Sequence, residues 1–97
     1  MERYVAVEIT HVRYGATAKT ESEIVAYQWR NPDDGVSGSS NRLIMVDWIE
    51  NKRGTAYVQT GSLRARVAVV RPDHGQPFLR TRADQEWTNN LLQLPEF

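Results

Sequence analysis

Alternation of apolar and polar residues along several short segments is the feature that most limits how this chain can fold. In residues 4–13, "YVAVEITHVR", Val5, Val7 and Ile9 fall on the same side of an extended backbone. A period of two with β-branched residues is typical of a strand that buries one face. The same pattern predicts further strands at 23–30, 55–60, 63–71 and 77–82. We therefore expect a mostly antiparallel sheet of about five strands, in which the first two form a hairpin with a long loop.

In residues 41–54 the apolar residues recur at the spacing of a helix instead. Leu43, Val46 and Ile49 recur at that spacing, and other large apolar residues lie outside this stripe, so we expect neighbours on more than one side of the helix. The preceding segment, 31–40, is rich in Pro, Asp, Gly and Ser and predicts a flexible surface loop. The expected fold class is α+β, with one helix packed on the sheet.

The turn at residues 61–62, Gly followed by Ser, fixes the pairing of two predicted strands. Glycine at the first position of a two-residue turn favours a type II′ hairpin. That register places Val58 beside Ala65 on one face and Tyr57 beside Arg66 on the other. The pattern thus separates into a core face and a polar face, as a well-specified register does.

The next pairing follows from keeping apolar residues together. A five-residue loop at 72–76 places Leu79 beside Val69 and Arg66 opposite Arg82. The outer face then collects arginines and aromatic rings. Its candidate binding residues are Tyr57, Arg64, Arg66, Phe78, Arg80 and Arg82, with Gln59 beside them.

Like charges directly opposite one another destabilise a sheet. We therefore expect negative charge, from the protein or from a partner, to offset the repulsion within this arginine cluster. One interpretation is a solvated face whose arginines pair with Glu8, Asp84 or Glu86. The other is a surface that binds anions. Nucleic acid would place phosphates on the arginines and bases on Tyr57 and Phe78, whereas an acidic protein partner would use the arginines alone.

Signals for catalysis and metal binding are missing from the sequence. The chain has no cysteine, and its two histidines, His11 and His74, lie far apart without a metal-ligand pattern. We therefore expect no metal, no cofactor and no enzymatic activity. The competing interpretation is a small-ligand or enzyme domain with a pocket near Trp29, Trp48 and Trp87.

Composition sets the remaining limits. The 97 residues predict a single domain spanning 1–97, and the twelve basic and twelve acidic residues cancel. No signal peptide and no apolar run long enough to cross a membrane is present in the sequence. We expect a soluble, cytoplasmic protein that does not use membranes, and its state as a monomer or a homodimer stays open.

Large apolar residues gather in the last segment, 87–97. We expect Leu91, Leu92, Leu94 and Phe97 to fold back over the sheet or helix and close the core. The alternative is that this tail docks on a second subunit. The side-chain amides of the two asparagines at 89 and 90 are expected to tie the preceding turn to the backbone.

The same region carries a family resemblance. Its matching residues are Leu79, Arg80, Thr81, Asp84, Asn89, Asn90, Leu91, Leu94, Pro95 and Phe97, together with Ile9, Thr10, Val12 and Arg13 near the start. In these positions the sequence resembles the small bacterial family catalogued as domain of unknown function 3892. The resemblance implies a small bacterial or phage-borne protein without an established activity, so it supplies no catalytic residues.

These observations favour a small non-enzymatic binding module that recognises protein or nucleic acid through its arginine-rich sheet face. An alternative within binding is a phage or mobile-element accessory protein that blocks a host factor, because small size and lack of chemistry suit such a role.

Overall fold

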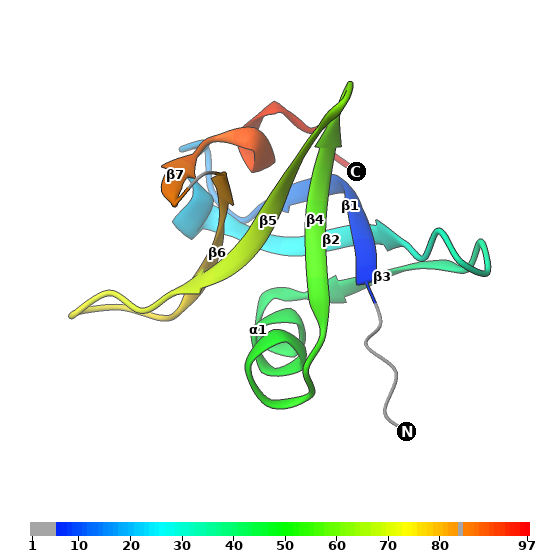
Figure 1. The fold of residues 1–97 in the computed structure, drawn as a ribbon. Helices are drawn as coiled ribbons and strands as arrows, with labels where there is room; N and C mark the ends of the chain where they lie inside the picture. The colour runs from blue at the N-terminus through cyan, green and yellow to red at the C-terminus, as the bar shows by residue number, and fades with distance from the viewer. Residues whose placement is uncertain (1–5, 84) are drawn as a thin grey trace.

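The computed structural model describes residues 6–83 and 85–97 and contains one strongly twisted sheet (Figure 1). The sheet has seven strands in the order β3-β2-β1-β4-β5-β6-β7, and neighbours are antiparallel except β1 and β4, which are parallel. The strands are β1 (Ala6–Tyr14), β2 (Ile24–Arg30), β3 (Ser37–Asn41), β4 (Thr55–Thr60), β5 (Leu63–Val70), β6 (Phe78–Ala83) and β7 (Glu86–Thr88). The helices are α1 (Arg42–Asn51) and two short 3₁₀ turns, η1 (Glu21–Glu23) and η2 (Asn90–Gln93).

The α+β class is confirmed, but the expected number of strands was too low. β3 lies in the segment predicted as a flexible loop, and β7 lies in the predicted turn before the tail. β3 pairs with β2 with Gly38 opposite Trp29, and this pairing requires glycine because a β-carbon at residue 38 would come within 2.9 Å of the indole. The predicted positions at Val5 and Asp84 lie outside the described residues.

The predicted register of the central strands is confirmed. Tyr57 pairs with Arg66, and the pairing runs regularly to the turn at 61–62. On the other side of β5, Arg66 pairs with Arg82 and Val69 with Leu79. One face of these strands is therefore buried, and the other carries the arginines.

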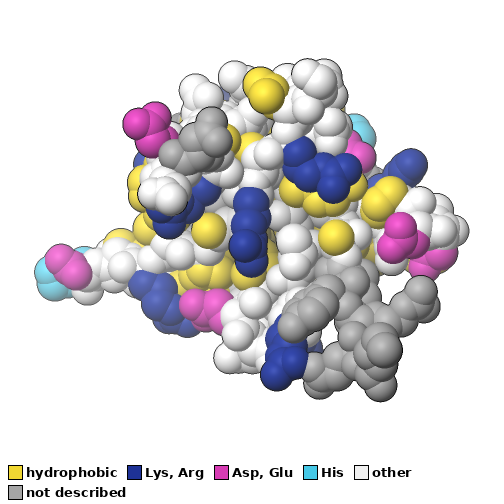
Figure 2. All heavy atoms as spheres, in the orientation of Figure 1, with side chains coloured by type: hydrophobic (Ala, Val, Ile, Leu, Met, Phe, Trp, Pro, Cys, Tyr) yellow, Lys and Arg dark blue, Asp and Glu magenta, His cyan; other side chains and the backbone are white. Residues whose placement is uncertain are grey.

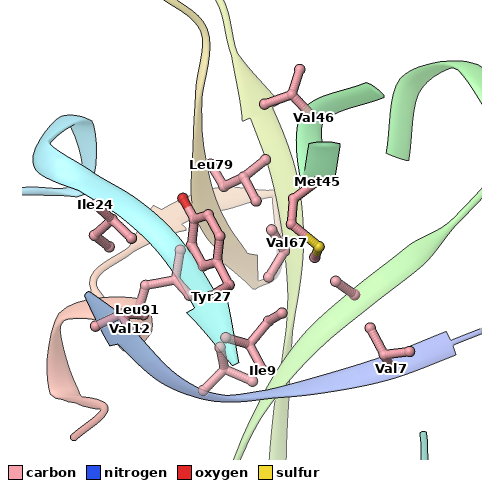
Figure 3. Close-up of a cluster of buried hydrophobic side chains, with 12 residues drawn as sticks. Val7, Ile9, Val12, Ile24, Tyr27, Met45, Val46, Val67, Leu79 and Leu91 are labelled. Atoms are coloured by element: carbon pink, nitrogen blue, oxygen red, sulfur yellow. The ribbon is translucent and has the colours of Figure 1, made fainter. Parts of the chain in front are cut away.

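The core lies on the inner face of the sheet and is covered by α1 (Figure 3). Met45 and Val46 are the buried residues of this helix, whereas Leu43 and Ile44 are 61% and 57% exposed. The prediction that neighbours cover the helix on more than one side is therefore wrong for its first turn. The fully enclosed large side chains come from the strands and from η2: Ile9, Val12, Ile24, Tyr27, Val58, Val67, Leu79 and Leu91.

The apolar tail closes the core within the chain. Leu91 is fully buried, and Leu92 and Leu94 pack against the same cluster. The backbone N–H of Val12 donates to the carbonyl of Pro95 over 3.0 Å, and the N–H of the last residue donates to the carbonyl of Val12 over 3.2 Å. Since β4 pairs only with the first residues of β1, the tail takes the edge of β1 beyond that pairing.

A buried hydroxyl joins β6 to the tail. Thr81 is fully buried, and its Oγ1 accepts from the Thr88 hydroxyl over 2.6 Å and from the backbone N–H of Asn90 over 3.2 Å. The Asn90 side-chain oxygen lies 2.5 Å from the same Thr88 hydroxyl, as a second acceptor for it. The predicted amide contact of Asn90 is thus made with a hydroxyl rather than with the backbone.

Replacing Thr81 by valine is expected to lower the free energy of unfolding by about 1–3 kcal/mol, because valine keeps the volume but leaves buried polar groups unsatisfied. Chemical denaturation measures this change. Thr60→Val is the matched control, since Thr60 is an exposed strand residue, and it should change stability by less than about 0.5 kcal/mol. Equal changes in the free energy of unfolding of the two variants would show that the hydroxyl network contributes nothing to stability.

Candidate binding face of the sheet

The six predicted site residues lie on the outer face of β4, β5 and β6, which we call the arginine face: Tyr57, Arg64, Arg66, Phe78, Arg80 and Arg82. Alternation along each strand places them there, because their immediate neighbours Val58, Ala65, Val67, Leu79 and Thr81 point into the core. Figure 2 shows basic side chains spread over these strands with apolar surface between them. The arginines at 64–66 and 80–82 therefore share one face.

Tyr57 and Arg64 form one unit of this face. The Arg64 guanidinium carbon lies 4.0 Å from the centre of the Tyr57 ring, and its Nε donates to the Gln59 side-chain oxygen over 3.2 Å. Tyr57 is only 5% exposed. Its ring supports Arg64 by a cation–π contact and is not open for a base to stack on.

Arg80 is held in place by internal contacts. Its Nε lies 3.5 Å from a carboxylate oxygen of Glu21 and 3.3 Å from the carbonyl of Thr88, to which it donates. Both charged side chains are partly shielded, and Glu21 is the more buried of the two. Arg80 therefore joins η1 to β6, which is a structural role that the strand pattern alone did not indicate.

Arg82 and Trp87 form a second aromatic unit at the end of the face. Trp87 pairs with Arg82 across β6 and β7, and the guanidinium carbon lies 5.0 Å from the indole ring. Arg82 also donates to the carbonyl of Gln85 over 3.0 Å. Trp87 is 42% exposed and Phe78 is half-buried, so Trp87 is an exposed aromatic residue on this face.

A hollow of about 480 Å³ opens beside Arg66 and Arg82. Its lining combines these two arginines with apolar atoms of β5 and of α1: Val67, Ala68, Val69 and Ile49, with Glu50 and Gln85 at the side. Arg71 donates to Glu50, and this hydrogen bond lowers the pKa of the carboxyl below its usual range. The hollow is thus apolar at its base and is bordered by two arginines and an acid that is already paired.

Three arginines of the face have no acidic partner among residues 6–83 and 85–97. The ion pairs among the described residues join Lys19 to Glu96, Lys52 to Asp47, Arg71 to Glu50 and Arg80 to Glu21. Within the same described ranges, Arg64, Arg66 and Arg82 form no ion pair, and Arg66 faces Arg82 directly. The positive charge of this part of the sheet is therefore not offset by the acids that the structure places.

The predicted tryptophan pocket is formed by two of its three residues. Trp29 and Trp48 line a cavity of about 290 Å³ between β2, β3 and α1, whereas Trp87 lies on the arginine face. The grouping of all three tryptophans is therefore wrong. Strand pairing separates Trp87 from the others, because β7 and β2 lie far apart in the sheet order.

Two further features bear on the class of protein. In residues 6–83 and 85–97, no three His, Asp or Glu side chains gather closely enough to hold a metal ion. Among the helices of this described part, none combines the length and the apolar character needed to cross a membrane.

The fold and the site define a small α+β domain with a curved sheet, one helix and a basic outer face. The chain belongs to the family described as protein of unknown function (DUF3892), which it matches over residues 8–95. No curated protein and no solved structure matches it.

Proposed function

We propose that the protein is a non-enzymatic binding module whose arginine face recognises an acidic segment of a protein partner. The observation that carries this proposal is the pair Arg66 and Arg82, which lie opposite each other at the border of an apolar hollow, where Glu50, the one acid among the described lining residues, is paired with Arg71. Carboxylates of a partner would relieve the repulsion between the two guanidinium groups, because arginine binds carboxylate in a bidentate manner. An apolar side chain of the same segment would fill the hollow.

Several features favour a protein segment over nucleic acid as the partner. Nucleic-acid binding by a sheet depends on open aromatic rings and on many phosphate contacts. Here Arg64 covers the Tyr57 ring, and Arg80 is bound to Glu21, so Phe78, Trp87 and three arginines remain. An apolar hollow next to paired arginines is better matched by a segment that alternates acidic and apolar residues.

The test uses a short fluorescent peptide that alternates Glu and Leu, measured by polarisation at low salt. The wild-type protein should bind it, and Arg66→Gln should weaken binding by about tenfold or more. Arg30→Gln is the matched control, since Arg30 is an exposed strand arginine outside the arginine face, and it should leave the affinity nearly unchanged.

Two probes separate the proposal from its rivals. A peptide with Lys in place of each Glu tests whether apolar contact alone suffices, and oligothymidylate tests nucleic acid. Binding of the Lys peptide as tight as that of the Glu peptide would overturn the charge argument. Binding of oligothymidylate without binding of the Glu peptide would assign the face to nucleic acid instead.

A further inference from the structure

The cavity between Trp29 and Trp48 is a second candidate site, separate from the arginine face. Trp29 comes from β2 and Trp48 from α1, and the remaining apolar lining comes from Val7, Val36, Ile44 and Met45. Its volume of about 290 Å³ is near the lower end of the range for small-molecule sites and holds a ligand of one or two rings. This cavity shares no lining residue with the hollow beside Arg66 and Arg82.

Both indoles are fixed before any ligand arrives. A β-carbon on Gly54 would lie 2.1 Å from the Trp48 ring, so that ring packs directly on the glycine backbone. The Trp29 ring lies against Gly38 in the same way, and its Nε1 donates to the Ser40 hydroxyl over 3.2 Å. Walls that are held in this manner lose little conformational entropy when a ligand binds.

The charged groups around the cavity favour a cation. One carboxylate oxygen of Asp34 accepts from the backbone N–H of Val36 over 2.9 Å, and the other oxygen has no hydrogen bond within the described part of the chain. Asp33 lies next to it in the same exposed loop, the acidic tip at the right of Figure 2. Lys52 also lines the cavity, but its ammonium lies 3.7 Å from Asp47 and its charge is matched there.

We propose that this cavity binds a small planar aromatic molecule that carries an ammonium group. The ring would lie between the two indoles, and the ammonium would reach the free oxygen of Asp34. An ammonium near tryptophan also gains a cation–π contribution. Val36 and Ile44, which are 54% and 57% exposed at this site, would lose water contact when the ring enters.

The experiment compares tryptamine with indole-3-propionate, which share a ring and a chain length but have opposite charges. Each is titrated into the isotopically labelled protein, and the indole N–H signals are followed in proton–nitrogen correlation spectra. Tryptamine should shift the signals of Trp29 and Trp48 in a saturable manner and bind about threefold or more tighter than the propionate. The Trp87 signal should stay in place and is the internal control.

Two matched variants test the role of Asp34. Asp34→Asn keeps the oxygen that accepts from Val36, so the loop should stay folded, and it should remove the preference for tryptamine while ring binding remains. Asp33→Asn should keep the preference. Equal affinity of the two ligands for the wild type, or no shift at Trp29 and Trp48, would overturn the proposal. Arg66→Gln should not alter these titrations, so failure here is distinct from failure of the arginine face.

Discussion

Replacing Leu91 by alanine should lower the free energy of unfolding by about 2–5 kcal/mol, the cost typical of a leucine removed from a packed core. Leu91 has no exposed surface, and it belongs to the cluster that includes Ile9 and Leu79. The new cavity would lie where the tail joins the sheet, which limits how far the surroundings can relax. Urea denaturation of the two proteins measures the difference.

Leu63→Ala is the matched control for this variant. Leu63 is 71% exposed in the turn region of the β4–β5 hairpin, so the same chemical change should cost less than about 0.5 kcal/mol there. If Leu91→Ala lowered the free energy of unfolding no more than Leu63→Ala, this would contradict the packing of the tail within the chain. Removal of residues 91–97 gives a second test, because a tail that served only as a contact between subunits would leave a folded monomer.

The central strands were predictable because two local signals agree. A two-residue turn with glycine at its first position fixes one register, and the alternation of apolar residues on both strands fixes the same one. A shift by one residue would have moved Val58 and Val67 to the solvent. The opposition of Arg66 and Arg82 follows from this register, and so it was visible in the sequence.

The edges of the sheet were not predictable by the same reasoning. β3 has the sequence "SGSSN", which lacks β-branched residues, and its pairing with β2 leaves room for the Trp29 ring only because residue 38 is glycine. Contacts between segments that are distant in the sequence were not predicted either, because no local pattern indicates them. Glu21 reaches Arg80 only because η1 lies beside β6, and no spacing in the sequence indicates this neighbour.

Four of the residues that carry the family resemblance have structural roles in this chain. Leu79, Thr81 and Leu91 are fully buried, and Pro95 holds the edge of β1 through its carbonyl. The shared ending therefore describes how the core is closed rather than a reacting site. The large apolar residues of the tail predicted its fold, and the resemblance gave no information about a ligand.

Stability should also fall at alkaline pH, because of Tyr27. Its side chain is fully buried in the core, and this burial raises the pKa of its hydroxyl far above the ordinary value of 10.0. In the unfolded chain the hydroxyl loses its proton near the ordinary value, whereas in the folded protein it keeps the proton. Above that pH the unfolded state binds fewer protons, so the free energy of unfolding decreases as pH rises.

The contribution of Tyr27 is thus fully present below the unfolded pKa and is lost above it, at about 1.4 kcal/mol for each further pH unit. Urea denaturation over a pH series from neutral to about 11 measures this slope. Tyr27→Phe should flatten it, since phenylalanine fills the same space without a titrating group. Tyr14→Phe is the control, because Tyr14 lies at the end of β1 with its ring partly exposed, and it should leave most of the slope in place. An unchanged slope in Tyr27→Phe would mean that the core admits the phenolate, contrary to the packing around this ring.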